Sequence, residues 1–224
     1  MKPRKIIFYD LETNGLSSSL DRRLEVYLAK YNFEKGKAKF EKEFHSLVKI
    51  DNNHVDRYAF KKNGWTDEFM NTNGRPMEEV MIDTAQMLNE DQESILCGYV
   101  IKTFDNHFLQ KMWKRYAFTP FDFDSRTFDL AIEYKATLAG LYERFDREDW
   151  RSVHNMVLRN DYSHYIKLTG YGLKTEHCCA YYGIPVEEGQ QHNARYDTNL
   201  NIEILKKQRP EWFAPIVKPK TSKK

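Results

Sequence analysis

The sequence has few cysteines, little net charge and no long apolar segment. Its 224 residues include three cysteines, Cys97, Cys178 and Cys179, whose spacing matches neither a zinc site nor a paired disulfide framework. The formal net charge is only +2, so a surface for a polyanion would have to be local. No apolar run reaches the roughly 18 residues of a membrane span, and the N-terminus MKPRKIIF lacks a signal core. We therefore expect a soluble cytoplasmic protein that does not contact a membrane.

The remaining composition is that of a globular domain. Hydrophobic residues make up 41% of the chain, which is enough to bury a core. We expect one domain over residues 1–209, followed by a basic, flexible tail over residues 210–224. A charged helical segment at about residues 132–167 is expected to be an insertion in this domain.

The pattern of apolar residues predicts a mixed α/β sheet with helices on both faces. Three early strands form a meander, and β-α units follow them. Strands are expected at residues 6–8, 22–33, 38–48 and 94–101, with a short edge strand at 121–128. Residues 51–74 are expected to form a loop, and helices at 75–89, 104–116, 172–182 and 192–208.

Two carboxylates, Asp10 and Glu12, end the first strand. Residues two apart in a strand point the same way, so these like charges would lie together unless a cation separates them. Oxygen ligands of this kind suit Mg²⁺ or Mn²⁺. Asp-x-Glu also occurs at residues 91–93 and 146–148, in polar sequence where a solvated surface is the natural interpretation. From this pair alone, a functional site and a solvated strand end both remain open.

Asp105 begins a helix and shares a face with Phe108, Leu109 and Met112. A carboxylate on an apolar face is costly unless it has a partner. Capping of the helix N-terminus is the alternative role, and Asp is well suited to it.

Asp197 lies on the apolar stripe of the last predicted helix, three and seven residues before Leu200 and Ile204. His192 precedes Asp197 by five residues, at the start of that helix. A lone His is usually structural, but a His beside a carboxylate on an apolar stripe is more informative than either residue alone.

Three blocks in this order resemble a known enzyme family. YDLETNGL, CGYVIKTFDNHFL and QHNARYDTNLNIEIL are similar to the three motifs of the DEDD 3′-5′ exonucleases, the DnaQ-like proofreading nucleases with an RNase H-like fold. His192 and Asp197 have the spacing of the DEDDh branch, since the sister branch has Tyr where this chain has Asn193. The resemblance covers most of the chain apart from residues 132–167 and the tail.

The resemblance implies a fold, a set of site residues and a cofactor. The fold would be an RNase H-like five-stranded sheet, made of a three-strand antiparallel meander plus parallel strands. His192 would be the general base, and two Mg²⁺ or Mn²⁺ ions would be held by the carboxylates Asp10, Glu12, Asp105 and Asp197. The pocket for the 3′-terminal nucleotide would be lined by Thr13, Asn14, Gly15 and Leu16, with Phe104 and Phe108 as further contacts or core residues.

The chain departs from the family at two places. Many members carry Asn shortly before the second motif's Asp, where this chain has Val100 and Ile101. The segment 132–167 is longer than the compact domain requires. It could guide single-stranded nucleic acid along a basic wall, or form an ordinary solvated helix pair. The residues of that wall would be Arg144, Arg147, Arg151 and Trp150.

We therefore expect a metal-dependent 3′-5′ exonuclease that hydrolyses single-stranded ends to nucleoside monophosphates, DNA in preference to RNA. It would act alone or beside a separate polymerase or repair partner, in DNA repair or proofreading. The alternatives are a 3′-5′ exoribonuclease, a non-catalytic nucleic-acid-binding protein on the same fold, and a metal hydrolase of another fold.

Overall fold

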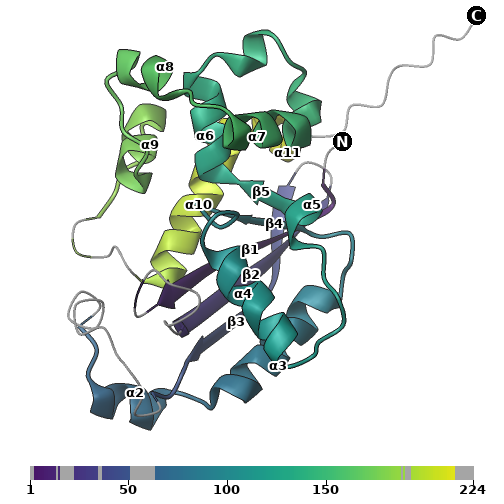
Figure 1. Cartoon of the computed structure of the whole chain (residues 1–224), viewed down its shortest axis with the longest axis vertical. Coiled ribbons are helices and arrows are strands. Elements are labelled where there is room, and N and C mark those ends of the chain that lie inside the picture. The colour runs from purple at the N-terminus through teal and green to yellow at the C-terminus, as the bar shows by residue number, and fades with distance from the viewer. Residues whose placement is uncertain are drawn as a thin grey trace, which may run out of the picture.

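A five-stranded mixed sheet forms the centre of the protein in this computed structural model, with the strand order β3-β2-β1-β4-β5 (Figure 1). The strands are β1 (Lys5–Thr13), β2 (Arg23–Glu34), β3 (Lys37–Leu47), β4 (Ile95–Gly98) and β5 (Thr127–Asp129). β1, β2 and β3 form an antiparallel meander, whereas β4 runs parallel to β1 and β5 runs parallel to β4. The structure describes residues 3–13, 15, 23–34, 37–50, 64–187, 189 and 193–214. The predicted meander with added parallel strands is confirmed.

Helices cover both faces of the sheet, as the sequence predicts (Figure 1). α3 and α4 pack on one face, and α6, α9 and α10 pack on the other. The helices are α2 (Asp67–Asn73), α3 (Met77–Asn89), α4 (Asp105–Arg115), α5 (Phe123–Arg126), α6 (Leu130–Leu138), α7 (Trp150–Arg159), α8 (Ser163–Leu168), α9 (Thr175–Tyr182), α10 (Ala194–Gln208) and α11 (Pro210–Phe213). None of the helices in these described ranges is long and apolar enough to cross a membrane.

The alternation of side chains along β1 divides the core into two parts. Ile7 and Tyr9 belong to the cluster with α3 and α4, whereas Ile6 and Phe8 belong to the cluster with α10. All four side chains are at most 1% exposed. Because the side-chain period of a strand is two, the carboxylates that follow on the Ile6 and Phe8 face point toward α10. The buried part of β1 therefore sets the direction of the acidic residues at its end.

A buried ion cluster fastens the predicted insertion to the end of α10. Glu133 on α6 is fully buried, and its Oε1 lies 2.9 Å from Nη2 of Arg209. Its Oε2 lies 3.0 Å from Nε2 of the fully buried His154 on α7. The hydroxyl of Tyr142 also donates to Oε2. Helices α6 and α7, in the upper part of Figure 1, are thus joined to the end of α10 by charges that the chain itself supplies.

Three of the four residues named for a basic wall make contacts within the fold, and of these only Trp150 is buried. Trp150 is only 2% exposed and packs against Phe128, with ring centroids 5.0 Å apart. Arg147 Nη2 donates to the Gln208 carbonyl at 2.5 Å, and Arg151 Nε donates to the Ser125 carbonyl at 2.9 Å. The burial of Trp150 therefore corrects its place in the expected basic wall, whereas Arg147 and Arg151 are exposed at the surface of the insertion.

Two expected elements differ from the structure because side chains cap short helices there. Residues 67–73, within the expected loop, form α2, and the Thr66 hydroxyl accepts from Phe69 N at 3.1 Å. The expected edge strand at 121–128 is instead α5 followed by the three-residue β5, and Asp122 Oδ1 caps α5 by accepting from Ser125 N at 3.0 Å. Both caps are local hydrogen bonds from a backbone N–H to a side chain, and they favour a short helix over the expected loop or strand.

The ordered chain also extends beyond the expected start of the tail. Pro210–Phe213 forms α11, and Trp212 is 4% exposed in the core beside Phe128. The described chain ends at Ala214, and the rest of the expected tail, residues 215–224, lies outside the described residues.

Candidate active site

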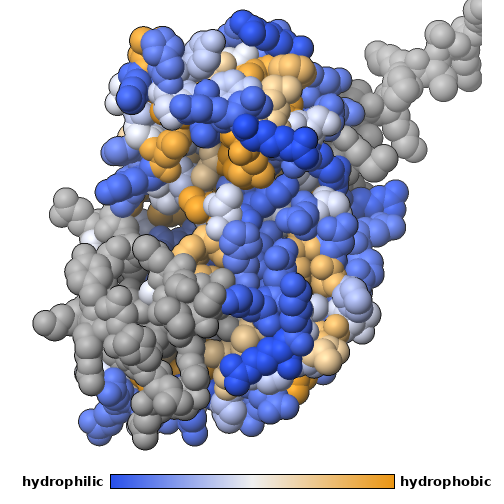
Figure 2. Space-filling view, viewed as in Figure 1, coloured by the Kyte–Doolittle hydropathy of each residue, from blue (hydrophilic) through white to orange (hydrophobic). Residues whose placement is uncertain are grey.

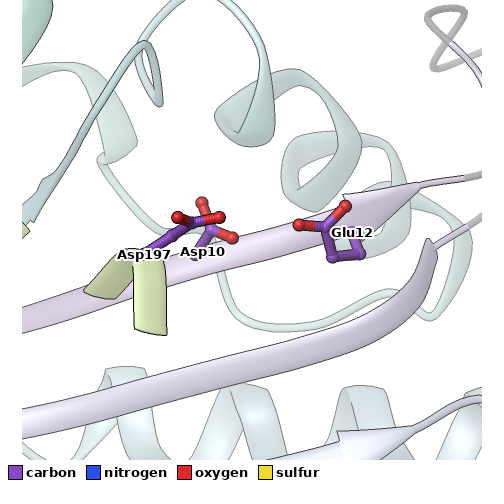
Figure 3. A group of neighbouring side chains, drawn as sticks. All are labelled: Asp10, Glu12 and Asp197. Carbon is purple, nitrogen blue, oxygen red and sulfur yellow. The ribbon is translucent and has the colours of Figure 1, made fainter. Parts of the chain in front are cut away.

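Three carboxylates from two distant parts of the chain meet at the end of the sheet. Asp10 and Glu12 come from β1 and Asp197 comes from the first turn of α10, as Figure 3 shows. One ligand oxygen from each residue lies within 4.8 Å of the others, and all three residues are partly exposed. The three carboxylates lie close together as the sequence predicts, and they form an acidic group that is open to solvent.

The position of Asp197 follows from how α10 begins and packs. Asn193 caps the helix, since its side chain accepts from Tyr196 N at 3.0 Å. Leu200 and Ile204, three and seven residues after Asp197, are buried in the cluster that contains Ile6 and Phe8. A helix whose apolar stripe lies on this face of β1 must bring Asp197, on the same stripe, to the two β1 carboxylates.

Asp105 lies beside this group and is held against β1. It is 3% exposed, and its Oδ1 accepts from Leu11 N at 3.1 Å. It does not cap α4, because the cap residue is Phe104 and no side chain bonds there. Asn106 fixes the same turn, since it accepts from the Tyr9 hydroxyl and donates to Thr127 Oγ1 at 3.0 Å. In place of the expected helix cap, Asp105 therefore makes a contact between α4 and the backbone of β1.

The electrostatics of these carboxylates are unfavourable to their ionised forms. Burial is the largest cause that raises the pKa of Asp10 well above 3.8, and the neighbouring charges of Asp105, Glu12 and Asp197 raise it further. Burial also raises the pKa of Asp105, although the Leu11 amide partly opposes this shift. A divalent cation among these oxygens would reverse the shifts by supplying the opposite charge.

The acidic group lies in a cavity of 240 Å³, which we call the acidic cavity. Its lining contains Phe104 as predicted, whereas Phe108 is 1% exposed and packs in the core against Phe104, with ring centroids 5.1 Å apart. Phe108 is therefore placed in the core, the role that sequence reasoning set beside substrate contact. The other lining residues are Asp10, Leu11, Glu12, Tyr99, Val100, Asp105, Thr175, Glu176, Val186, Asp197, Leu200 and Asn201.

The remaining predicted site residues lie at the end of β1 or before α10. Thr13 Oγ1, directly after the acidic pair, donates to the Gly15 carbonyl at 2.7 Å. Asn14, Leu16 and the expected general base His192 lie outside the described residues.

A comparison with known protein families identifies the family to which this chain belongs. The RNase T family, described as Exonuclease, matches residues 7–205, which include β1 from Ile7 onward and α10 as far as Leu205. The chain belongs to this exonuclease family. It is therefore related to the DnaQ-like 3′-5′ exonucleases, which are hydrolases, and it has the RNase H-like fold that the sequence predicts. The all-carboxylate donor set fits the hard divalent metals that this exonuclease family uses.

Solved structures of E. coli exonuclease I share the fold of this exonuclease. A complex with a dA16 oligonucleotide matches with a TM-score of 0.68 and 18% identity, over 93% of this chain and 42% of that chain. A zinc-bound complex with single-stranded DNA matches with a TM-score of 0.67 and 17% identity, over the same shares, 93% and 42%. This chain thus spans less than half the length of these structures. No sequence among the curated proteins matches the chain.

Sequence reasoning missed several lining residues of this exonuclease cavity. Asn201 could have been found, because it lies one helical turn after Asp197 on the same face. Thr175 and Glu176 could not, because only the placement of α9 brings them to the cavity. Val100 has a positive φ of 65°, a conformation that Asn adopts more readily than a β-branched residue. Val100, one of the two residues that stand where many family members carry Asn, thus has a backbone conformation that suits Asn.

Proposed function

We propose that the protein is a metal-dependent 3′-5′ exonuclease that releases nucleoside monophosphates from single-stranded nucleic acid. The observation that carries this proposal is the acidic group of Asp10, Glu12 and Asp197 in a solvent-open cavity. Its residues lie within the part of the chain that matches the exonuclease family. The raised pKa of Asp10 supports a site that is incomplete without a cation.

The four carboxylates Asp10, Glu12, Asp105 and Asp197 would hold two Mg²⁺ or Mn²⁺ ions. Bound there, the ions would activate the attacking water and stabilise the leaving 3′ oxygen. Asp105 is oriented for this role by the Leu11 amide, and Asp197 by the first turn of α10. All four carboxylates lie on a strand or on helices, and such rigid elements position side chains more precisely than loops do.

His192 would accept the proton of the attacking water, since a neutral imidazole is an effective base near pH 7. It directly precedes Asn193, the cap of α10, and so lies close in sequence to Asp197. Thr13, Asn14, Gly15 and Leu16 would contact the terminal nucleotide, together with Phe104, which lines the acidic cavity. Backbone amides and apolar side chains grip sugar and base without reading sequence.

We further propose that DNA is preferred over RNA, and that the protein serves repair or proofreading beside a separate polymerase or repair partner. Support for DNA comes from the exonuclease I structures, which contain a dA16 oligonucleotide or single-stranded DNA. The proposed domain spans residues 1–209 with α11 added, and residues 132–167 form its insertion.

The test is digestion of 5′-labelled single-stranded DNA and RNA of one sequence with Mg²⁺, with Mn²⁺ and with EDTA. We expect a metal-dependent ladder that shortens from the 3′ end, faster on DNA. His192→Ala should abolish the ladder while leaving binding of the strand intact. If wild-type protein binds both strands but cleaves neither under any metal condition, the non-catalytic binding function replaces the proposal.

A further inference from the structure

A second cavity adjoins the acidic cavity, and Val100 lines both. Its volume is 460 Å³, and it lies between the turn after β4 and the helices α6 and α7 of the insertion. The Tyr99 hydroxyl, on the side of the acidic cavity, donates to the Leu173 carbonyl at 2.9 Å and so connects the walls of the two cavities. We call this second cavity the α6–α7 groove; it is lined by Val100, Thr103, Asp129, Ala131, Ile132, Lys135, Val157, Leu158, Arg159, Asn160, Asp161 and Leu173.

Val100 forms a fixed apolar ridge between the two cavities. Its φ of 65° is unusual for a β-branched residue, and its side chain is 40% exposed. The N–H of Val100 donates to Asp129 Oδ1 at 3.3 Å, and its carbonyl accepts from Thr103 N and Phe104 N at 3.2 and 3.1 Å. Residues in strained backbone conformations cluster at functional sites, and hydrogen bonds to the backbone N–H and carbonyl of Val100 hold this one in place.

Asp129 joins this ridge to the insertion. It is fully buried, and its Oδ2 accepts from Lys102 N at 2.8 Å in the same turn as Val100. Its Oδ1 also accepts from Ala131 N and Ile132 N at 2.9 and 3.1 Å, which caps α6. One carboxylate therefore holds the start of α6 against the turn that separates the two cavities. The insertion is positioned by this contact as a wall of the site.

The lining of the groove suits a flexible polyanion with apolar faces. Lys135 on α6 and Arg159 on α7 provide two positive charges, and the exposed carboxylate of Asp161 accepts from Ser163 N at 2.8 Å. Leu158 and Leu173 expose 43% and 41% of their surfaces in the same lining. Figure 2 shows apolar patches beside strongly hydrophilic ones on this upper part of the molecule. Cations for phosphates and apolar side chains for base faces are the features of single-strand binding surfaces.

We propose that the α6–α7 groove binds the nucleotides immediately 5′ of the one held in the acidic cavity, with Lys135 and Arg159 contacting their phosphates. This assignment rests on the proposed exonuclease function. The occupant is a single strand because the bases of a duplex are stacked on one another, so Leu158 and Leu173 could not meet their faces. The insertion thus extends the substrate site.

The test compares a substrate that reaches the groove with one that does not. The p-nitrophenyl ester of thymidine 5′-monophosphate occupies the acidic cavity alone, whereas a single-stranded 12-mer extends beyond it. The double variant Lys135→Gln/Arg159→Gln is matched by Arg115→Gln/Lys207→Gln, which removes one Arg and one Lys from exposed positions away from the groove. Leu158→Ser tests the apolar lining separately, at a residue exposed enough to change without unfolding the protein.

For the groove variant we expect KM on the 12-mer to rise about tenfold, with kcat and hydrolysis of the ester unchanged. Two lost phosphate contacts should also reduce the slope of log K against log salt by about 1.4. Leu158→Ser should raise KM about threefold. Equal KM values for the groove variant and the control variant would overturn the proposal.

A binding measurement tests the groove independently of the proposed exonuclease function. Anisotropy of a labelled 12-mer with Ca²⁺ should show about tenfold weaker binding for the groove variant, whether or not wild-type protein cleaves. If wild-type protein hydrolyses neither substrate yet the groove variant binds the 12-mer more weakly, the exonuclease function is contradicted and binding of the strand in the groove is supported. If cleavage occurs but affinity is unchanged by the variant, the groove fails alone.

Discussion

The acidic cavity and the Glu133 cluster both contain buried or half-buried carboxylates, but their charges are balanced in opposite ways. In the cavity, burial and the neighbouring carboxylates raise the pKa of Asp10. Burial would likewise raise the pKa of Glu133, yet the bond to His154 and the charge of Arg209 lower it below 4.5. One region gathers charges of a single sign, and the other surrounds a carboxylate with partners from the chain.

The difference separates a site from a structural element. Glu133 is paired with Arg209 and His154 within the fold, so its role is to fasten α6 to the end of α10. Asp10, Glu12 and Asp197 repel one another in the folded protein, and a cation is the partner that would reverse this. Proteins keep such unfavourable arrangements mainly where function requires them.

The largest expected effect is on catalysis. Asp10→Asn keeps the shape of the side chain but removes a metal-binding charge, and we expect a loss of about 10³-fold in kcat/KM, or about 4 kcal/mol. Because the same change removes repulsion, the metal-free variant should be more stable than wild type at pH 7, by about 1 kcal/mol. Digestion rates and urea unfolding measure the two effects. Asp124→Asn, an exposed carboxylate on α5, is the control; equal losses in both variants would contradict the role of Asp10.

The second effect is on stability. Glu133→Gln leaves Arg209 buried without its counter-charge, and we expect the free energy of unfolding to fall by about 3 kcal/mol. Urea unfolding measures this loss, while kcat of the folded fraction should be unchanged. Glu203→Gln removes the partner of Lys206 on the exposed side of α10 and should cost less than about 0.5 kcal/mol. If the two variants lose the same stability, the cluster does not fasten the insertion.

The pH dependence of this loss follows from the sign of the Glu133 shift. A folded-state pKa below 4.5 means that the cluster stabilises the protein fully above pH 4.5 and loses that contribution as the pH falls through the folded value. The difference in unfolding free energy between wild type and Glu133→Gln should therefore be constant from pH 6 to pH 7 and shrink below about pH 4.5. A difference that persists at lower pH would contradict the shift.

The smallest expected effect is stabilisation by metal. Mg²⁺ at about 100 times its dissociation constant should add about 2.7 kcal/mol to wild type, and much less to Asp10→Asn. The effect should grow as the pH rises from 5 to 8, because the raised pKa of Asp10 makes the ionised, metal-binding form more populated at higher pH. Thermal unfolding with and without EDTA measures it. Equal shifts in both proteins would place the bound metal elsewhere.

Sequence reasoning succeeded where periodicity decides the structure. Asp10 and Glu12 share a strand face, and Asp197 shares a helix face with Leu200, because periods of two and 3.6 are local properties of the backbone. The same reasoning failed for residues 67–73 and 121–128, where single capping bonds from Thr66 and Asp122 changed the element. It also misassigned Trp150, whose burial depends on Phe128.

The sequence by itself determined the order of the elements, the face of each motif and the family of the enzyme. Only the tertiary structure decided that Asp105 bonds to the Leu11 amide, 94 residues away, and that Arg209 pairs with Glu133, 76 residues away. It also decided that Val100 and the insertion share a groove. Such partners are set by the packing of whole elements against each other, which no local pattern encodes.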